Sequence, residues 1–213
     1  MKSLLKLLVL TALLGYTALI CAQAPPFSAD MIVTMVMDPQ SAAMMEKAGM
    51  KPTQTMKLYV SGLKMRIEGG SGPQQTLSIA DFSPNGSVYL ISLANHTYLE
   101  MSHTADMKSN LGKLADFLKY GGDPCAIHDD NRVSCQKTDM GAVDGRPCQN
   151  YKLVRKSEPE QTLCLDSKLH FPLRTSSKSS SSEVNNIKEG SQPASLFALP
   201  PGLKKQELPH AGS

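Results

Sequence analysis

A two-residue alternation of apolar and polar side chains recurs along most of this 213-residue chain and limits what it can fold into. In the segment 27–37 the odd positions are apolar, so their side chains share one face of a predicted strand. That set is Phe27, Ala29, Met31, Val33, Met35 and Met37. Further strands are predicted at 56–60, 63–67, 77–79, 88–93, 97–101, 125–128, 133–138, 147–155, 161–167, 170–178 and 183–188. So many regularly spaced strands predict a mainly β (α+β) fold, either a barrel or a strongly curved antiparallel sheet.

Two short helices interrupt the strands. Ser41 can cap a helix that runs through Ala48, ends at Gly49 and carries Met44 and Met45. The segment 110–120 is the stronger helix, with an apolar stripe of Leu111, Leu114 and Leu118 before the glycine pair 121–122. The serine run 179–182 predicts an exposed turn, and the apolar stretch 196–202 ends the fold.

The first residues are typical of a secretory signal peptide. Lys2 precedes an apolar run from Leu4 to Ile20 that is broken only by Lys6 and a few small or polar residues, and small residues follow it. We expect cleavage after Ala22, which makes residues 1–22 the signal peptide, 23–205 a single domain and 206–213 a disordered tail. Attachment of a lipid to Cys21 is the alternative, although the residue before it is bulky for such a site. The mature protein is therefore expected in the periplasm.

Charge argues against nucleic acid as a partner. Without Lys2 and Lys6, 20 of the 22 basic residues remain against 19 acidic ones, a formal charge of +1. A nucleic-acid binder would carry a clustered basic surface.

Four cysteines remain in the mature chain, and an even number in an exported protein predicts two disulfides. Three pairings are possible. Cys125 and Cys135 flank one polar turn, and Cys148 and Cys164 flank another, so the hairpin geometry favours these two pairs. Each would stabilise the fold by roughly 3 kcal/mol or less. Zinc binding is the alternative, but structural zinc sites usually contain close CxxC pairs, which this chain lacks.

The chain contains no sequence signature of a known catalytic site. GxSxG, HExxH, P-loop and paired-glycine nucleotide motifs are absent, and no two of the five histidines have helical metal-ligand spacing. We therefore predict no enzyme activity, no metal and no cofactor.

Methionine is abundant, with 12 residues, whereas tryptophan is absent. Met31, Met35, Met56 and Met65 recur on the apolar faces of successive strands, where a flexible side chain can fit irregular apolar partners. The alternatives are an ordinary methionine-rich core or copper binding through thioethers, which would require methionine clustered with histidine in a flexible loop.

Five segments carry a resemblance to a known superfamily. They are 57–68 (KLYVSGLKMRIE), 145–151 (GRPCQNY), 162–166 (TLCLD), 172–174 (PLR) and 196–202 (LFALPPG). With them the chain, over residues 27–205, resembles the LolA/LolB-like superfamily of periplasmic lipoprotein carriers and is similar to an uncharacterised bacterial domain family within it. The two predicted disulfides and the few aromatic residues depart from the best-known carriers.

The resemblance implies an incomplete barrel, with one or two short helices as a lid over an apolar cavity. Met44 and Met45 would help to close that opening. The cavity is expected to be lined by Met31, Val33, Met35, Met37, Met56, Leu58, Met65, Leu111, Leu114 and Leu118. The expected function is a periplasmic binding protein for a lipid or a lipoprotein acyl chain, with peripheral contact with the cell envelope. The alternative is an envelope sensor or protein-interaction module with a filled core.

Overall fold

The computed structural model describes residues 24–47, 49, 51–70, 75–83, 85–102, 115, 117–118, 121–125, 133–155 and 159–207. The predicted signal peptide, Cys21 and the predicted lid residues Leu111 and Leu114 lie outside this described part. Within it, no helix is long and apolar enough to cross a membrane.

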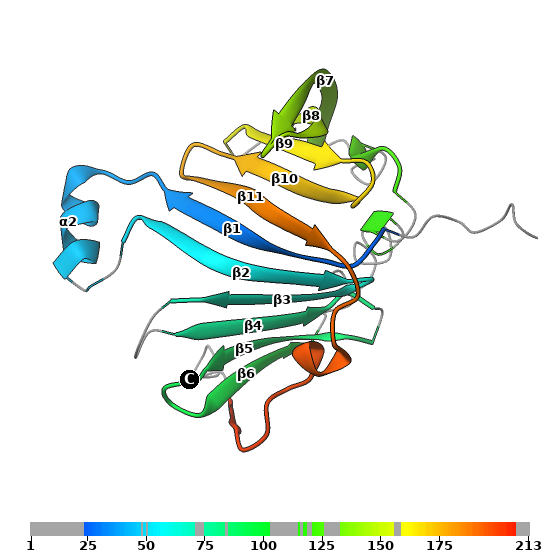
Figure 1. Ribbon diagram of the computed structural model, residues 1–213. Coiled ribbons are helices and arrows are strands. Elements are labelled where there is room, and N and C mark those ends of the chain that lie inside the picture. Colours follow the sequence, from blue (N-terminus) through cyan, green and yellow to red (C-terminus); the bar gives the residue numbers. More distant parts are fainter. Residues whose placement is uncertain are drawn as a thin grey trace, which may run out of the picture.

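One sheet, antiparallel except for the parallel pair β6 and β12, accounts for nearly all of the described fold (Figure 1). Its twelve strands lie in the order β12-β6-β5-β4-β3-β2-β1-β11-β10-β9-β8-β7, and the sheet does not close into a barrel. The strands are β1 (Phe27–Met35), β2 (Thr53–Ser61), β3 (Lys64–Gly69), β4 (Thr76–Asp81), β5 (Ser87–Ser92), β6 (Thr97–Ser102), β7 (Val133–Val143), β8 (Arg146–Arg155), β9 (Gln161–Asp166), β10 (Phe171–Ser176), β11 (Ser180–Glu189) and β12 (Lys204–Gln206). The predicted curved, incomplete barrel is confirmed.

The predicted methionine-bearing strands do place their apolar side chains on one face, which we call the methionine face. Met31 of β1 lies opposite Met56 of β2, and Met65 of β3 lies opposite Val60 of β2. At the centre of this face Phe27, Leu58 and Leu173 are fully buried, and Met31 and Met65 pack against them.

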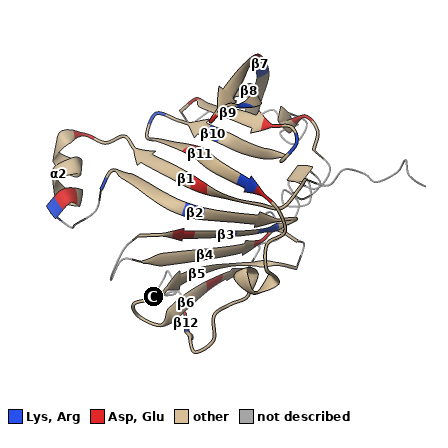
Figure 2. Ribbon diagram, in the orientation of Figure 1, with Lys and Arg blue, Asp and Glu red and all other residues tan. Residues whose placement is uncertain are grey.

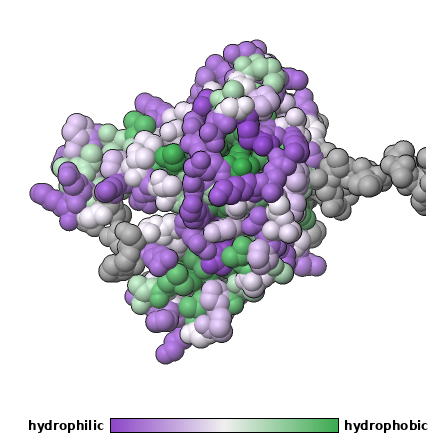
Figure 3. Space-filling model, viewed as in Figure 1, coloured by the Kyte–Doolittle hydropathy of each residue, from purple (hydrophilic) through white to green (hydrophobic). Residues whose placement is uncertain are grey.

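The opposite face of β3 to β6 is covered by the C-terminal segment. Leu77, Ile79 and Ile91 form a buried cluster there, against which Leu199 and Leu203 pack. The 3-10 helix η3 (Ala194–Phe197) lies beside β3, where the Arg66 guanidinium donates to the carbonyl oxygen of Leu196 at 2.8 Å. Figure 3 shows apolar side chains gathered over β4 to β6. The apolar stretch 196–202 therefore completes a second, smaller core.

At the other end, the sheet curls so strongly that the β7–β8 turn reaches β11, three strands away from β8. The Asp144 carboxylate in that turn accepts a hydrogen bond from the backbone N–H of Asn186 at 2.7 Å. Arg146, at the start of β8, bridges the carboxylates of Asp166 and Glu189 at 2.8 and 3.0 Å. These contacts fix the curvature of the half-barrel. Elsewhere the two signs of charge are interspersed along the described strands (Figure 2).

The helix α2 (Pro39–Lys47) does not close the cavity as expected, because it projects beyond the sheet at the end of β1 (Figure 1). None of its residues is buried, and Met44 is 66% exposed. Its cap is Asp38 and not Ser41: the Asp38 carboxylate accepts the backbone N–H groups of Gln40 and Ser41, both at 3.0 Å. Pro39 then occupies the first helical position, where no N–H is needed.

Three strand boundaries differ from the predictions. Ser180 to Ser182 are the start of β11 and not a turn. All three pair with β1, and Ser181 and Ser182 also pair with β10, which overrides the low strand propensity of serine. Cys125 lies in a short 3-10 turn and not in a strand, while 126–128 lie outside the described residues. Gln206, expected to begin the disordered tail, is the last residue of β12.

We predict that replacing Arg146 destabilises the fold, because Asp166 is only 4% exposed and would lose its cation. Arg146→Met should lower the free energy of unfolding by about 3 kcal/mol in a urea titration. Lys57→Met is the control: its ion pair with Asp30 lies at the surface, with Lys57 60% exposed, and its loss should change stability far less. If Arg146→Met and Lys57→Met lower the free energy of unfolding equally, the Arg146 contacts do not hold the curvature of the sheet.

Stability should also fall in acid. The Lys168 ammonium, and after it the Arg146 guanidinium, hold the pKa of Glu189 below its usual 4.5. A depressed folded-state pKa stabilises the protein above the unfolded-state value, and this contribution is lost as pH falls below about 4.5. In urea titrations across this pH range, the free energy of unfolding should fall less on acidification for Glu189→Gln than for the native protein. If the free energies of unfolding of the two proteins fall in parallel with pH, Glu189 does not make this contribution.

Candidate functional site

The methionine face is filled at its centre and hollow toward β6. Successive cross-strand partners place this first hollow on the methionine face, and they are Leu58, Ile67, Ser78, Leu90, Leu99 and Gln206. A second hollow lies at the β7 end of the sheet, where a register shift between Pro172 and Arg174 interrupts the pairing of β9 with β10.

The first hollow, which we call the β2–β6 groove, has a volume of about 450 Å³. This lies within the range of roughly 300–1,000 Å³ that is usual for small-molecule sites. Its lining residues are Met56, Ile67, Thr76, Leu77, Ser78, Leu90, Ile91, Ser92, Thr97, Tyr98, Leu99 and Gln206.

Two adjacent rows of side chains explain the shape of the groove. Ile67, Leu90 and Leu99 supply apolar walls in one row, with the small Ser78 between them. The next row is made of Thr76, Ser92 and Thr97 beside Gly69, all at the ends of their strands.

Met56 reaches into the groove because Gly69 leaves room for it. A Cβ atom at Gly69 would lie 3.0 Å from the Met56 Cγ. The groove wall is also open to solvent, since Leu90 is 43% exposed and Met101, on the same face, is 39% exposed. Large apolar side chains left exposed beside a hollow are typical of a binding surface.

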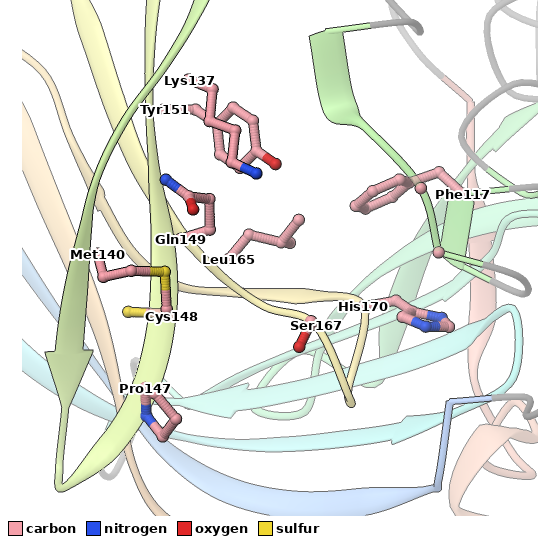
Figure 4. Close-up of a pocket in the computed structure, with 12 residues that line it drawn as sticks. Phe117, Lys137, Met140, Pro147, Cys148, Gln149, Tyr151, Leu165, Ser167 and His170 are labelled. Atoms are coloured by element: carbon pink, nitrogen blue, oxygen red, sulfur yellow. The ribbon is translucent and has the colours of Figure 1, made fainter.

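The second hollow lies between the helical residues 117–118 and strands β7 to β9, and we call it the disulfide-framed pocket (Figure 4). It has a volume of about 350 Å³. Phe117, Tyr151 and Leu165 form a buried cluster beside it, and Leu118 packs against them. Figure 4 shows Tyr151, Gln149 and Leu165 entering the hollow from the sheet and Phe117 entering from the other side.

The structure contains both disulfides that the hairpin geometry predicts. The Cα–Cα distances are 5.2 Å for Cys125–Cys135 and 5.3 Å for Cys148–Cys164. Cys125–Cys135 ties the segment after the helix to β7. Cys148 is only 1% exposed and lies in the pocket wall. It is bonded to Cys164, the residue before Leu165. The disulfides therefore connect the elements that form the second hollow.

His170 and Gly121 close another side of this pocket. The ring Nδ1 of His170 lies 3.4 Å from the carbonyl oxygen of the helical residue Leu118. A Cβ at Gly121 would lie 2.6 Å from the His170 Nε2, and Gly121 has φ +71°, so glycine is required there on both counts.

The ten residues predicted to line one cavity lie in different parts of the protein. Met31, Val33, Met35, Met56, Leu58 and Met65 share the methionine face, and Met56 lines the groove, but Leu58 is fully buried and Met31 and Met65 pack on the core. Met37 lies beyond β1, and Leu118 packs beside the disulfide-framed pocket. Leu111 and Leu114 lie outside the described residues.

Sequence reasoning did not single out Leu90, Leu99 or Tyr151. Leu90 and Leu99 are apolar residues of recognised strands, but the strand register needed to place them beside Ile67 is not encoded in one strand alone. Among the described residues, no group of three His, Cys, Asp or Glu side chains could hold a metal ion.

No protein-family model and no curated protein matches the sequence. Among solved structures, an uncharacterized conserved protein from Thermus thermophilus superposes with a TM-score of 0.53 at 10% identity, over 86% of this chain and 90% of that one. MucB superposes with a TM-score of 0.50 at 10% identity, over 86% of this chain and 60% of MucB. The chain thus spans less than two thirds of MucB, which has also been solved in the complex of Pseudomonas aeruginosa MucA and MucB.

A putative outer membrane lipoprotein-sorting protein domain from Vibrio parahaemolyticus is also similar, at 10% identity over 81% of this chain and 89% of that one. Its TM-score of 0.36 is too low to add to the comparison. At these identities the comparisons describe the fold alone. The chain shares with the first two structures the fold of a curved and open sheet, which is the architecture that the resemblance to LolA/LolB-like proteins implies.

Proposed function

We propose that this protein is an exported binding protein that holds an alkyl chain, of a lipid or of an acylated lipoprotein, in the β2–β6 groove. The observation that supports this most directly is the groove itself, with Met56, Ile67, Leu90 and Leu99 as apolar walls. Burial of an alkyl chain is favourable by roughly 0.8 kcal/mol per methylene, which exceeds the cost of ordering a chain of moderate length. Binding of this kind requires no cofactor and no catalytic step.

Two features support export to the periplasm. The first residues have the pattern of a signal peptide, and the two disulfides are typical of proteins that fold in an oxidising compartment. In that compartment lipids and acylated lipoproteins are available as ligands, and peripheral contact with the envelope follows from such a role.

The alternative is a protein-interaction module that uses its outer surface. The filled centre of the methionine face supports it, because Leu58 and Phe27 leave no room for a ligand at that point. The complex of MucA with MucB provides a precedent for a protein partner of this fold. The two functions differ in whether the native protein carries a lipid.

Leu90→Asp tests the groove directly. It places a charge on the groove wall, and it should leave the fold intact because Leu90 is 43% exposed. Affinity for a fluorescent fatty acyl probe, measured by titration of delipidated protein, should fall about tenfold or more. Val154→Asp is the matched control, since Val154 is a 39% exposed apolar residue of β8 that does not line the groove.

Equal affinities of the native protein, Leu90→Asp and Val154→Asp would argue against the groove as the lipid site. Native mass spectrometry of the protein extracted from its own periplasm separates the two functions. A co-purifying lipid supports the binding protein, whereas a lipid-free protein that also fails to bind the probe supports the interaction module.

A further inference from the structure

A buried tyrosine side chain lies in the wall of the disulfide-framed pocket. Tyr151 is only 5% exposed, and it lines the pocket. Burial, and after it the nearby charge of Asp123, raises the pKa of Tyr151, so the hydroxyl keeps its proton at neutral pH. A buried tyrosine normally finds a hydrogen-bond partner, and a protonated hydroxyl can donate to an acceptor in the pocket.

A cation lies next to this hydroxyl. Lys137 of β7 is the cross-strand partner of Tyr151, and both line the pocket. Figure 4 shows the ends of their side chains on the same side of the hollow, across from Phe117. Among the described residues Lys137 takes part in no ion pair. The pocket thus presents two donors to an incoming group.

Three other polar groups near the pocket make contacts within the protein. The Gln149 amide donates to the carbonyl oxygens of Thr138 and Asp139, at 2.6 and 3.2 Å, and so holds the bulge in β7. The Asp123 carboxylate accepts the backbone N–H of Cys125 at 2.9 Å and does not line the pocket. His170 faces the carbonyl oxygen of Leu118.

We propose that the disulfide-framed pocket is a second binding site, for a small carboxylic acid with a short apolar body. The carboxylate accepts hydrogen bonds from the Tyr151 hydroxyl and the Lys137 ammonium, a charge-assisted arrangement. The apolar body packs against Phe117 and Leu165. The volume of about 350 Å³ is at the lower end for small-molecule sites and fits a compact ligand. This site is separate from the β2–β6 groove and does not depend on alkyl binding there.

The disulfides make this pocket preformed. Cys125 follows Gly122 by three residues and is bonded to Cys135, two residues before Lys137. Cys148 and Cys164 hold β8 and β9 together beside Tyr151 and Leu165. A site held by two cross-links loses little conformational freedom when a ligand binds, which favours affinity for a small molecule.

The test uses phenylacetate as the probe and 2-phenylethanol, which has a hydroxyl group in place of the carboxylate, as its neutral analogue. Isothermal titration calorimetry on the disulfide-intact protein should show tighter binding of phenylacetate. Tyr151→Phe, which removes only the hydroxyl, should weaken phenylacetate binding about tenfold or more and should weaken 2-phenylethanol binding less. Lys137→Met should also weaken phenylacetate binding and should reduce its dependence on salt.

Two control variants make the result specific. Lys152→Met removes the neighbouring lysine of β8, which points to the other face of the sheet and pairs with Glu160, so phenylacetate affinity should not change. Phenylacetate has no alkyl chain for the β2–β6 groove, so Leu90→Asp should also leave its affinity unchanged. The proposal is overturned if the native protein does not bind phenylacetate, if Tyr151→Phe binds it as tightly, or if Leu90→Asp is the variant that loses binding.

Discussion

The ion pair between Arg146 and Asp166 is the interaction on which the shape of this protein depends. Asp166 is almost fully buried, and its second carboxylate oxygen accepts the backbone N–H groups of Lys168 and Leu169, at 2.8 and 3.0 Å, which turn β9 into β10. The same arginine reaches Glu189 of β11. One side chain therefore connects β8, the β9–β10 turn and β11. A buried carboxylate is costly without its cation, so this end of the sheet must stay curled.

The curl decides where the sheet is filled and where it is hollow. In the centre, large side chains such as Phe27, Leu58 and Leu173 meet and leave no space. Toward β6 the same face carries Ser78 and Thr76 between larger residues, and the groove results. Toward β7 the helical residue Phe117 approaches the sheet without filling it, and the disulfide-framed pocket results. In the described part of the sheet, two hollows of different chemistry therefore lie on either side of a filled centre.

The two hollows suit different ligands because their walls differ. The groove offers methionine, leucine and isoleucine side chains with hydroxyl groups along one row, which suits an alkyl chain. The disulfide-framed pocket offers a buried tyrosine and an ammonium group opposite an aromatic ring, which suits an acid with an apolar body. Its walls are cross-linked on both sides, so it is the more rigid of the two.

The sequence by itself determined the sheet, the shared face of Met31, Met56 and Met65, and both disulfide pairs, because strand alternation and hairpin symmetry are local properties. It did not determine that Leu58 belongs to the filled core, that α2 projects from the sheet, or that Ser180 to Ser182 form a strand. Only the tertiary structure decided these, together with the meeting of Tyr151, Lys137 and Phe117. The reason is that burial and pocket formation depend on the register between distant strands and on the curl imposed by Arg146, which no single segment encodes.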